Sequence, residues 1–262
     1  MTLISPETRH HLIDEAVKLE REAHQFTQDK QIDRAFETYK RAAHIFEKAG
    51  EHYKSAVCYA AAATCWNVRV GRQPLHNAAE CSELAAISAL RAKNYSYARL
   101  HFREAAMFYE QEGNYEKFAR CYLQNKAADR LHNSELMAHP ETGLRERGLA
   151  ALRWLINMAG AILWGHGELP HRTFLCALAL IAVMSVIYWS SGLITLTGSS
   201  VAPAGFLESL YFSVITFSTV GYGDYLPLGW VRFFASIEAL SGIILAPLFL
   251  ISLQRRYLRI HR

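Results

Sequence analysis

Residues 207–224 read LESLYFSVITFSTVGYGD, and this stretch decides the architecture of the second half of the chain. The part over 207–217 is mainly apolar and suits a helix, but at about 1.5 Å per residue it reaches only half-way through a bilayer's hydrocarbon core. The part over 218–224 has glycines on both sides of Tyr222, which favour irregular backbone over a continued helix. The stretch therefore predicts a short helix followed by a loop.

Long apolar segments flank this stretch. No charged side chain occurs from Thr173 to Leu207, and few occur from there to Gln254. The pattern predicts an outer helix over 172–194 and an inner helix over 230–254, each long enough to cross a hydrocarbon core of about 30 Å. Non-helical backbone at membrane depth is tolerated only where it is buried in protein or lines a water-filled path. A half-helix and a loop between two spans therefore indicate a pore.

The loop resembles the selectivity filter of potassium channels, and residues 172–258 resemble the complete two-span pore of that family. The residues that carry the resemblance are Thr219, Val220, Gly221, Tyr222, Gly223 and Asp224. The resemblance implies one subunit of a homotetramer that conducts K⁺ passively. K⁺ would then be held by the Thr219 hydroxyl and by backbone carbonyls from four chains. Those carbonyls belong to Thr219, Val220, Gly221 and Tyr222.

Three neighbouring residues are expected to support the filter. Ser218 stands where the family often has threonine, and Tyr211 stands where many members have tryptophan. The Tyr211 hydroxyl is placed to bond Asp224, whereas Ile215 replaces a buried glutamate that some members carry behind the filter. Gly221 and Gly223 are expected to adopt backbone angles that turn successive carbonyls toward the axis.

The inner helix carries the candidate gate. Gly242 matches the family's hinge glycine, and Pro247 interrupts the helical hydrogen bonds five residues later. A purely structural bend is the alternative to a hinge. Leu250 or Gln254 is the candidate for a lower constriction, on the face that lines the cavity in the family. Glu238 is expected to lie off that face and to contact neighbouring helices.

A third apolar segment, over 149–164, contains Arg153 and Asn157 and is short. We expect it to lie along the membrane surface, within a linker over 141–171. The arginines after the inner helix place the C-terminus in the cytoplasm by the positive-inside rule. Met1 to Glu20 shows no signal peptide. Two spans then put both termini in the cytoplasm of a multi-pass plasma-membrane protein.

Residues 1–140 predict a soluble all-helical domain. Residues 42–50 reappear as 105–113, with a degenerate copy over 85–98, and a Gly or Asn is expected to end each helix. The pattern resembles tetratricopeptide-like and SNAP-like repeats over 8–134. The resemblance implies a scaffold for a cytoplasmic protein or a small-molecule ligand; a device for assembly is the alternative.

Other functions find no support in the sequence. No catalytic motif is present, which argues against an enzyme, and the scattered histidines lack metal-site spacing. The five cysteines form no CxxC pair and are expected to be reduced. Neither a nucleic acid nor an organic cofactor is needed; K⁺ and the lipid bilayer are the expected partners.

The sequence thus predicts an all-α protein, with a pore domain over 172–262 behind the soluble domain. No span has arginine at every third position, so control through the soluble domain is expected in place of voltage sensing. Two rival functions remain open: a membrane-anchored adaptor with a vestigial pore, and a weakly selective cation pore.

Overall fold

The computed structural model describes residues 5–67, 72–198 and 204–258. Its contacts divide into two units, Met1–Met158 and Ala159–Arg262, each described by itself below. Helices make up nearly all of the described regular structure, so the predicted fold class is confirmed.

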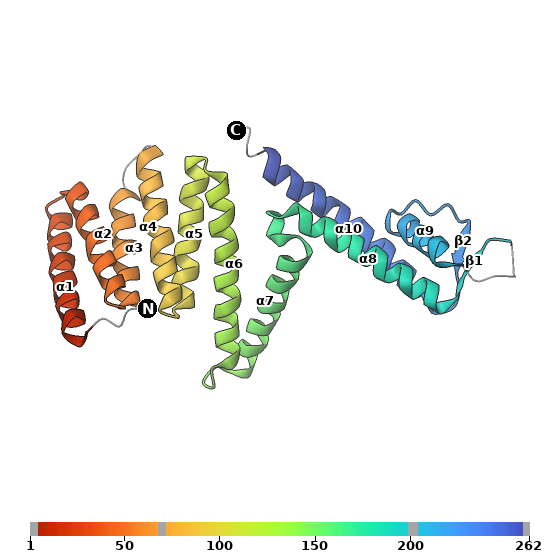
Figure 1. The fold of residues 1–262 in the computed structure, drawn as a ribbon, viewed down its shortest axis with the longest axis horizontal. Helices are drawn as coiled ribbons and strands as arrows, with labels where there is room; N and C mark the ends of the chain where they lie inside the picture. The colour runs from red at the N-terminus through yellow and green to blue at the C-terminus, as the bar shows by residue number, and fades with distance from the viewer. Residues whose placement is uncertain (1–4, 68–71, 199–203, 259–262) are drawn as a thin grey trace. The chain divides into compact units, whose positions relative to one another are not determined.

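The first unit begins with six helices in a row, each packed against the next in sequence (Figure 1). They are α1 (Pro6–Gln28), α2 (Ile32–Lys48), α3 (His52–Asn67), α4 (Arg72–Arg91), α5 (Tyr95–Glu112) and α6 (Tyr115–Ala138). The stack forms because each helix presents small alanines that allow close approach, with larger side chains filling the spaces between helices.

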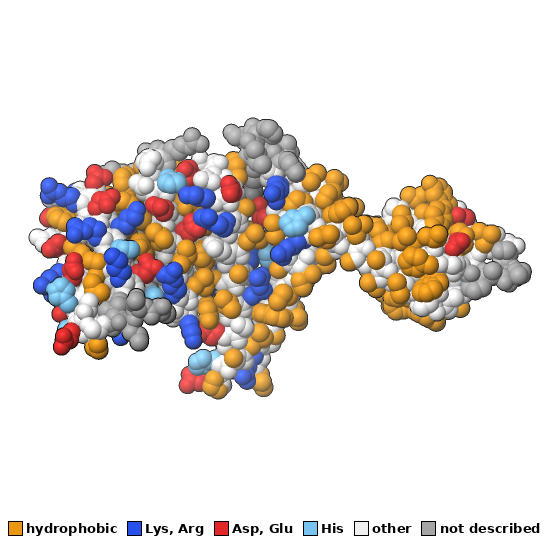
Figure 2. Space-filling view, in the orientation of Figure 1, with side chains coloured by type: hydrophobic (Ala, Val, Ile, Leu, Met, Phe, Trp, Pro, Cys, Tyr) orange, Lys and Arg blue, Asp and Glu red, His pale blue; other side chains and the backbone are white. Residues whose placement is uncertain are grey.

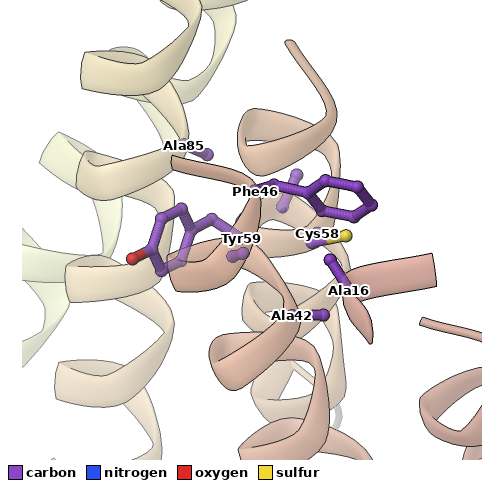
Figure 3. Close-up of a cluster of buried hydrophobic side chains, with 8 residues drawn as sticks. Ala16, Ala42, Phe46, Cys58, Tyr59 and Ala85 are labelled. Carbon is purple, nitrogen blue, oxygen red and sulfur yellow. The ribbon is translucent and has the colours of Figure 1, made fainter. Parts of the chain in front are cut away.

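One hydrophobic cluster shows this packing (Figure 3). Its labelled members come from α1 to α4 and are Ala16, Ala42, Phe46, Cys58, Tyr59 and Ala85. Phe46 is fully buried. Burial raises the pKa of the Cys58 thiol to about 12, and burial does the same for Cys81. These thiols are therefore protonated at neutral pH and pack as small apolar groups.

The helix ends agree with the expected turns at two places and differ at a third. Gly50 and Gly113 have positive φ, as left-handed C-caps require. In the middle copy, however, Lys93 takes the left-handed conformation, and Asn94 instead caps the start of α5 by accepting from the Tyr97 N–H. The expectation that Asn94 ends a helix is therefore wrong.

The similarity between residues 42–50 and 105–113 was interpreted as a repeat, and the structure does not support that interpretation. Residues 42–50 end α2 and residues 105–113 end α5, so the match is displaced by three helices. Hairpin repeats are related by an even number of helices. The match therefore reports similar helix endings and does not mark the repeat unit.

Helix α7 (Leu144–Leu163) follows the stack. Ala150 and Asn157 are buried, whereas Leu152 and Ile156, on the opposite face, are 54% and 64% exposed. Polar bonds tie Asn157 to α6. The contacts divide the chain at Met158, whereas the sequence led us to expect the end of the first domain at residue 140.

The second unit contains three helices, a short turn and a small ribbon (Figure 1). They are η1 (Gly165–Gly167), α8 (Pro170–Ser191), β1 (Ile194–Leu196), α9 (Phe206–Phe217), β2 (Tyr225–Pro227) and α10 (Val231–Leu258). The antiparallel strands pair Ile194 with Pro227 and Leu196 with Tyr225. The outer and inner helices were predicted, at 172–194 and 230–254, whereas the ribbon was not.

Helices α8 and α10 are the two candidate membrane spans among the described residues. In the most apolar stretch of each helix only 22% of the residues are buried, so neither is the core helix of a soluble protein. Figure 2 shows charges of both signs over α1–α6 and mainly hydrophobic side chains over the visible surface of the second unit. Such exposed apolar surface requires lipid or further protein to cover it.

Candidate ion-conduction site

Helix α9 places the loop that follows it. Its buried residues Phe212, Ser213 and Ile215 lie on the side that packs against α8 and α10. The ring of Phe212 meets that of Tyr188 from α8 edge to face, 5.1 Å between centroids. The carboxyl end of this short helix therefore points directly into residues 218–224, with its partial negative charge available to a cation.

The first part of the loop folds back on the end of α9. The Thr219 N–H donates to the Thr216 carbonyl at 3.0 Å. The N–H groups of Val220 and Gly221 donate to the Ile215 carbonyl at 3.0 and 3.3 Å. The backbone donors are thus directed toward the helix, while the carbonyls are not used in these bonds.

The sign of φ alternates along the loop. Thr219, Gly221 and Gly223 have φ of 58°, 50° and 77°, whereas Val220 and Tyr222 do not have positive φ. Alternation of this kind allows successive carbonyls to project to a common side. Thr219 is the informative residue, because positive φ is a real outlier for a β-branched side chain and such strain gathers at functional sites.

Four carbonyls of the loop, those of residues 219–222, have no hydrogen-bond partner in the described part of the chain. Across the described ranges, no hydrogen bond reaches the carbonyl oxygens of Thr219, Val220, Gly221 or Tyr222. All four residues are exposed, Tyr222 by 73%. A row of unpaired carbonyls is costly at membrane depth. This row is therefore chemically incomplete in one chain and suited to binding a cation.

The outer end of the loop is anchored by the ribbon. The Thr197 hydroxyl donates to the Gly223 carbonyl at 2.6 Å, and the Thr197 N–H donates to the Asp224 carbonyl at 2.7 Å. Sequence reasoning missed Thr197. The only available signal was weak: the β-branched Ile194 and Thr195, shortly before Gly198.

The expected support residues lie beside the loop. The Tyr211 hydroxyl interacts with the Asp224 carboxylate, and the supporting role expected of the two residues stays a prediction. The rings of Tyr211 and Tyr225 meet edge to face, 6.0 Å between centroids. The Ser218 hydroxyl donates to the Ile215 carbonyl at 3.3 Å, which adds a contact to the end of α9.

Glu238 of α10 is completely buried and lies against neighbouring helices, which confirms the expectation for this residue. Its Oε2 accepts from the Tyr188 hydroxyl at 2.6 Å, and its Oε1 accepts from the Ser213 hydroxyl at 2.5 Å. Tyr188 and Ser213 were not singled out from the sequence. Polar groups inside membrane segments usually pair with one another, and that rule was the signal for finding them.

The candidate gate residues lie along α10. Gly242 touches the end of α9, because a Cβ built on it would overlap the Phe217 carbonyl oxygen. Pro247 lies inside the helix. Leu250 is 62% exposed, and Gln254 is exposed on the same face. This exposure fits a face toward a pore axis; the gating roles stay predictions.

The structure also bears on metal binding. No group of three or more His, Cys, Asp or Glu side chains within residues 5–67, 72–198 and 204–258 is arranged to hold a metal ion.

Comparison with known proteins assigns the second unit. Residues 175–259 match the family model described as an ion channel. The matched segment contains nearly all of α8, all of α9 and the loop, and α10. The comparisons with curated proteins and with solved structures gave no match. The assignment is to ion channels and not to enzymes. The chain therefore carries an ion channel domain of this family at residues 175–259.

Proposed function

We propose that four copies of this chain form a potassium-selective channel. The carrying observation is the row of unpaired, exposed carbonyls from Thr219 to Tyr222, held by alternating φ between two candidate spans. A cation that enters the membrane must exchange its water for other oxygens. Rings of carbonyls, with the Thr219 hydroxyl below them, supply those oxygens for K⁺.

The incompleteness of a single chain supports the proposed homotetramer. One copy presents its carbonyls along one side only, whereas a cation must be surrounded. Closed rotational symmetry around an axis brings identical loops together and covers apolar surface on α8 and α10. Four copies give stacked rings of four oxygens, which is the arrangement of potassium filters.

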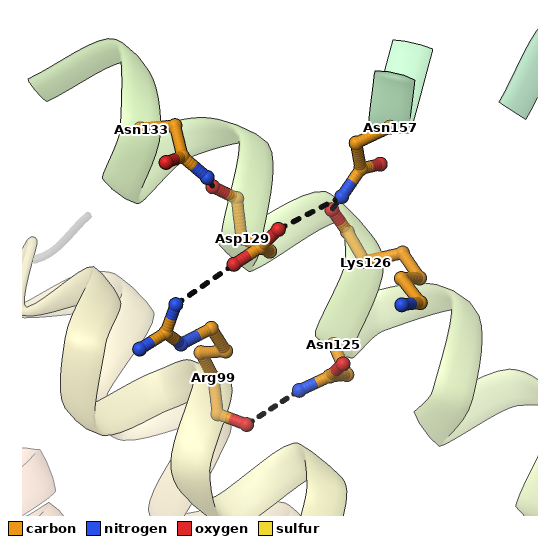
Figure 4. A network of polar contacts seen from close by, with 6 residues as sticks. All are labelled: Arg99, Asn125, Lys126, Asp129, Asn133 and Asn157. Carbon is orange, nitrogen blue, oxygen red and sulfur yellow. Dashed lines mark hydrogen bonds and ion pairs between the residues drawn. The ribbon is translucent and has the colours of Figure 1, made fainter. Parts of the chain in front are cut away.

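The soluble helices are proposed to regulate the pore through α7. A network of polar side chains joins α5, α6 and α7 (Figure 4). Arg99 pairs with Asp129 at 2.8 Å, and Asn157 of α7 donates to the same carboxylate at 3.0 Å. Arg130 donates to the Asn157 oxygen at 2.9 Å. Burial tends to raise the pKa of Asp129, but the bonds from Arg99 and Asn157 outweigh it and hold the pKa below its ordinary value.

Through this network the soluble domain would be connected to the pore domain. A partner or small ligand that moves α5 or α6 carries α7 with it, and α7 continues through η1 into α8. The exposed apolar side of α7 suits the cytoplasmic membrane surface, with both chain termini on that side of the plasma membrane. Binding biases the pore by its difference in affinity between open and closed forms, typically about 1–3 kcal/mol.

Ion flux from liposomes tests this function. The purified full-length chain should release K⁺ and not Na⁺ from loaded vesicles, and Ba²⁺ should block the release. Native mass spectrometry should show four subunits. Flux absent, or equal for the two ions, in vesicles that hold intact tetramers would refute potassium selectivity and favour the adaptor or the unselective pore.

A further inference from the structure

A buried polar cluster joins the three helices of the pore unit. Tyr188 of α8, Ser213 of α9 and Glu238 of α10 are each 0% exposed. The two hydroxyls lie 2.6 and 2.5 Å from the Glu238 carboxyl oxygens, and the Ser213 hydroxyl is also 3.1 Å from the Ile181 carbonyl of α8. The cluster is complete within one chain, so it does not depend on contacts between subunits.

Such a cluster holds helices firmly because it is costly to open. A buried carboxyl group that loses its partners keeps the full penalty of its desolvation. Separating α10 from α9 at this level would leave Glu238 and Ser213 buried without their hydrogen bonds, at the cost of that penalty. The hydrogen bonds therefore fix the height and rotation of α9, whose end positions the filter.

A second contact lies one helical turn further along both helices. Gly242 follows Glu238 by four residues on α10, and Phe217 follows Ser213 by four residues on α9. A Cβ at position 242 would overlap the Phe217 carbonyl oxygen, so this glycine is required by close approach. Residue 242 is thus packed against the base of the filter and has no room to bend away freely.

Further along α10, Pro247 weakens the helical hydrogen bonding. Its ring nitrogen cannot donate to the Ile243 carbonyl, so one helical hydrogen bond is missing there. Beyond it, Arg255 lies beside Gly167 of η1, where a Cβ would come within 2.9 Å of the guanidinium. The part of α10 after Pro247 (lower α10) therefore contacts η1, whereas the part before Pro247 (upper α10) contacts α9, the pore helix.

We propose that the Tyr188–Ser213–Glu238 cluster and the contact of Gly242 with Phe217 lock upper α10 to the pore helix, so that α10 bends at Pro247. In this arrangement Gly242 supports the filter and is not the hinge. Glu238 is a positioning residue that acts on the ions through α9. The proposal rests on the proposed channel function.

Single-channel recordings from reconstituted full-length protein separate the two roles. Gly242→Ala should lower unitary conductance or K⁺ selectivity, because the added Cβ displaces the Phe217 carbonyl below the filter. Pro247→Ala should change open probability by at least about fivefold with conductance unchanged. The matched control is Ser241→Ala, since among the described residues that hydroxyl bonds its own helix, at the Ile237 carbonyl; it should behave as wild type.

Variants of Glu238 test the proposal even if Gly242→Ala does not assemble into tetramers. Glu238→Gln can accept from Tyr188 and donate to Ser213, which then donates to Ile181. It should retain the wild-type conductance, whereas Glu238→Ala should lose conductance or selectivity.

The proposal is overturned if Gly242→Ala alters open probability alone, if Pro247→Ala gates as wild type, or if Glu238→Ala and Glu238→Gln conduct alike. An inactive wild-type tetramer would instead refute the channel function itself.

Discussion

Replacing Asn157 by alanine should loosen α7 without unfolding the helices before it. The side chain is 7% exposed and makes three hydrogen bonds, to Arg130, to the Asp129 carboxylate and to the Lys126 carbonyl. A typical net value of about 1 kcal/mol each gives a loss of roughly 3 kcal/mol. That free energy corresponds to a hundredfold or larger rise in local opening, since about 1.4 kcal/mol is a factor of ten.

Hydrogen–deuterium exchange of the full-length channel measures this opening. Amides of residues 144–158 should exchange about a hundredfold faster in Asn157→Ala, while those of α2 and α3 should not change. Arg153→Ala is the matched control, because that side chain lies exposed on the same helix and makes no hydrogen bond or ion pair with the described residues. Unchanged exchange over 144–158 would show that the network does not hold α7.

Three further predictions concern the first unit, Met1–Met158. The partners of Asp129 hold its pKa below the ordinary 3.8, so its bonds should stabilise α7 at neutral pH and be lost as the pH falls below about 4. Hydrogen–deuterium exchange of α7 at a series of pH values measures this loss. Asp129→Asn should remove the pH dependence. Phe46→Ala should lower the free energy of unfolding by about 3–5 kcal/mol in denaturant titrations, against little change for the half-exposed Tyr53→Ala. A chain beginning near Gly143 should still form potassium-selective tetramers with unchanged conductance and altered open probability; wild-type gating in recordings would mean that the soluble domain does not regulate the pore.

Much of the pore could be predicted from the sequence because membranes restrict the choices. Spans must be long and apolar, and a half-helix followed by a glycine-containing loop leaves few alternatives. The structure keeps these elements, with α9 beginning one residue before the predicted 207 and α10 continuing to Leu258. Glu238 could be placed off the pore face by helical periodicity alone.

The parts that escaped prediction depend on contacts between distant segments. Thr197 reaches the filter's outer end because the ribbon pairs Ile194–Leu196 with Tyr225–Pro227. Strands of three residues carry almost no sequence pattern. The contact between Gly242 and Phe217 depends on how closely α9 and α10 approach each other. The sequence does not show that distance, so the glycine was interpreted as a hinge. Asn157 looked like a polar interruption in an interfacial helix, although its partners lie about 30 residues earlier.

The reversal potential with K⁺ on one side of the membrane and Na⁺ on the other tests the central claim most directly. If the carbonyls of Thr219 to Tyr222 replace the water of K⁺, the current should reverse far toward the K⁺ equilibrium potential. A hundredfold permeability ratio corresponds to roughly 118 mV, since each factor of ten is about 59 mV for one charge. A reversal potential near zero in the reconstituted full-length channel would contradict potassium selectivity.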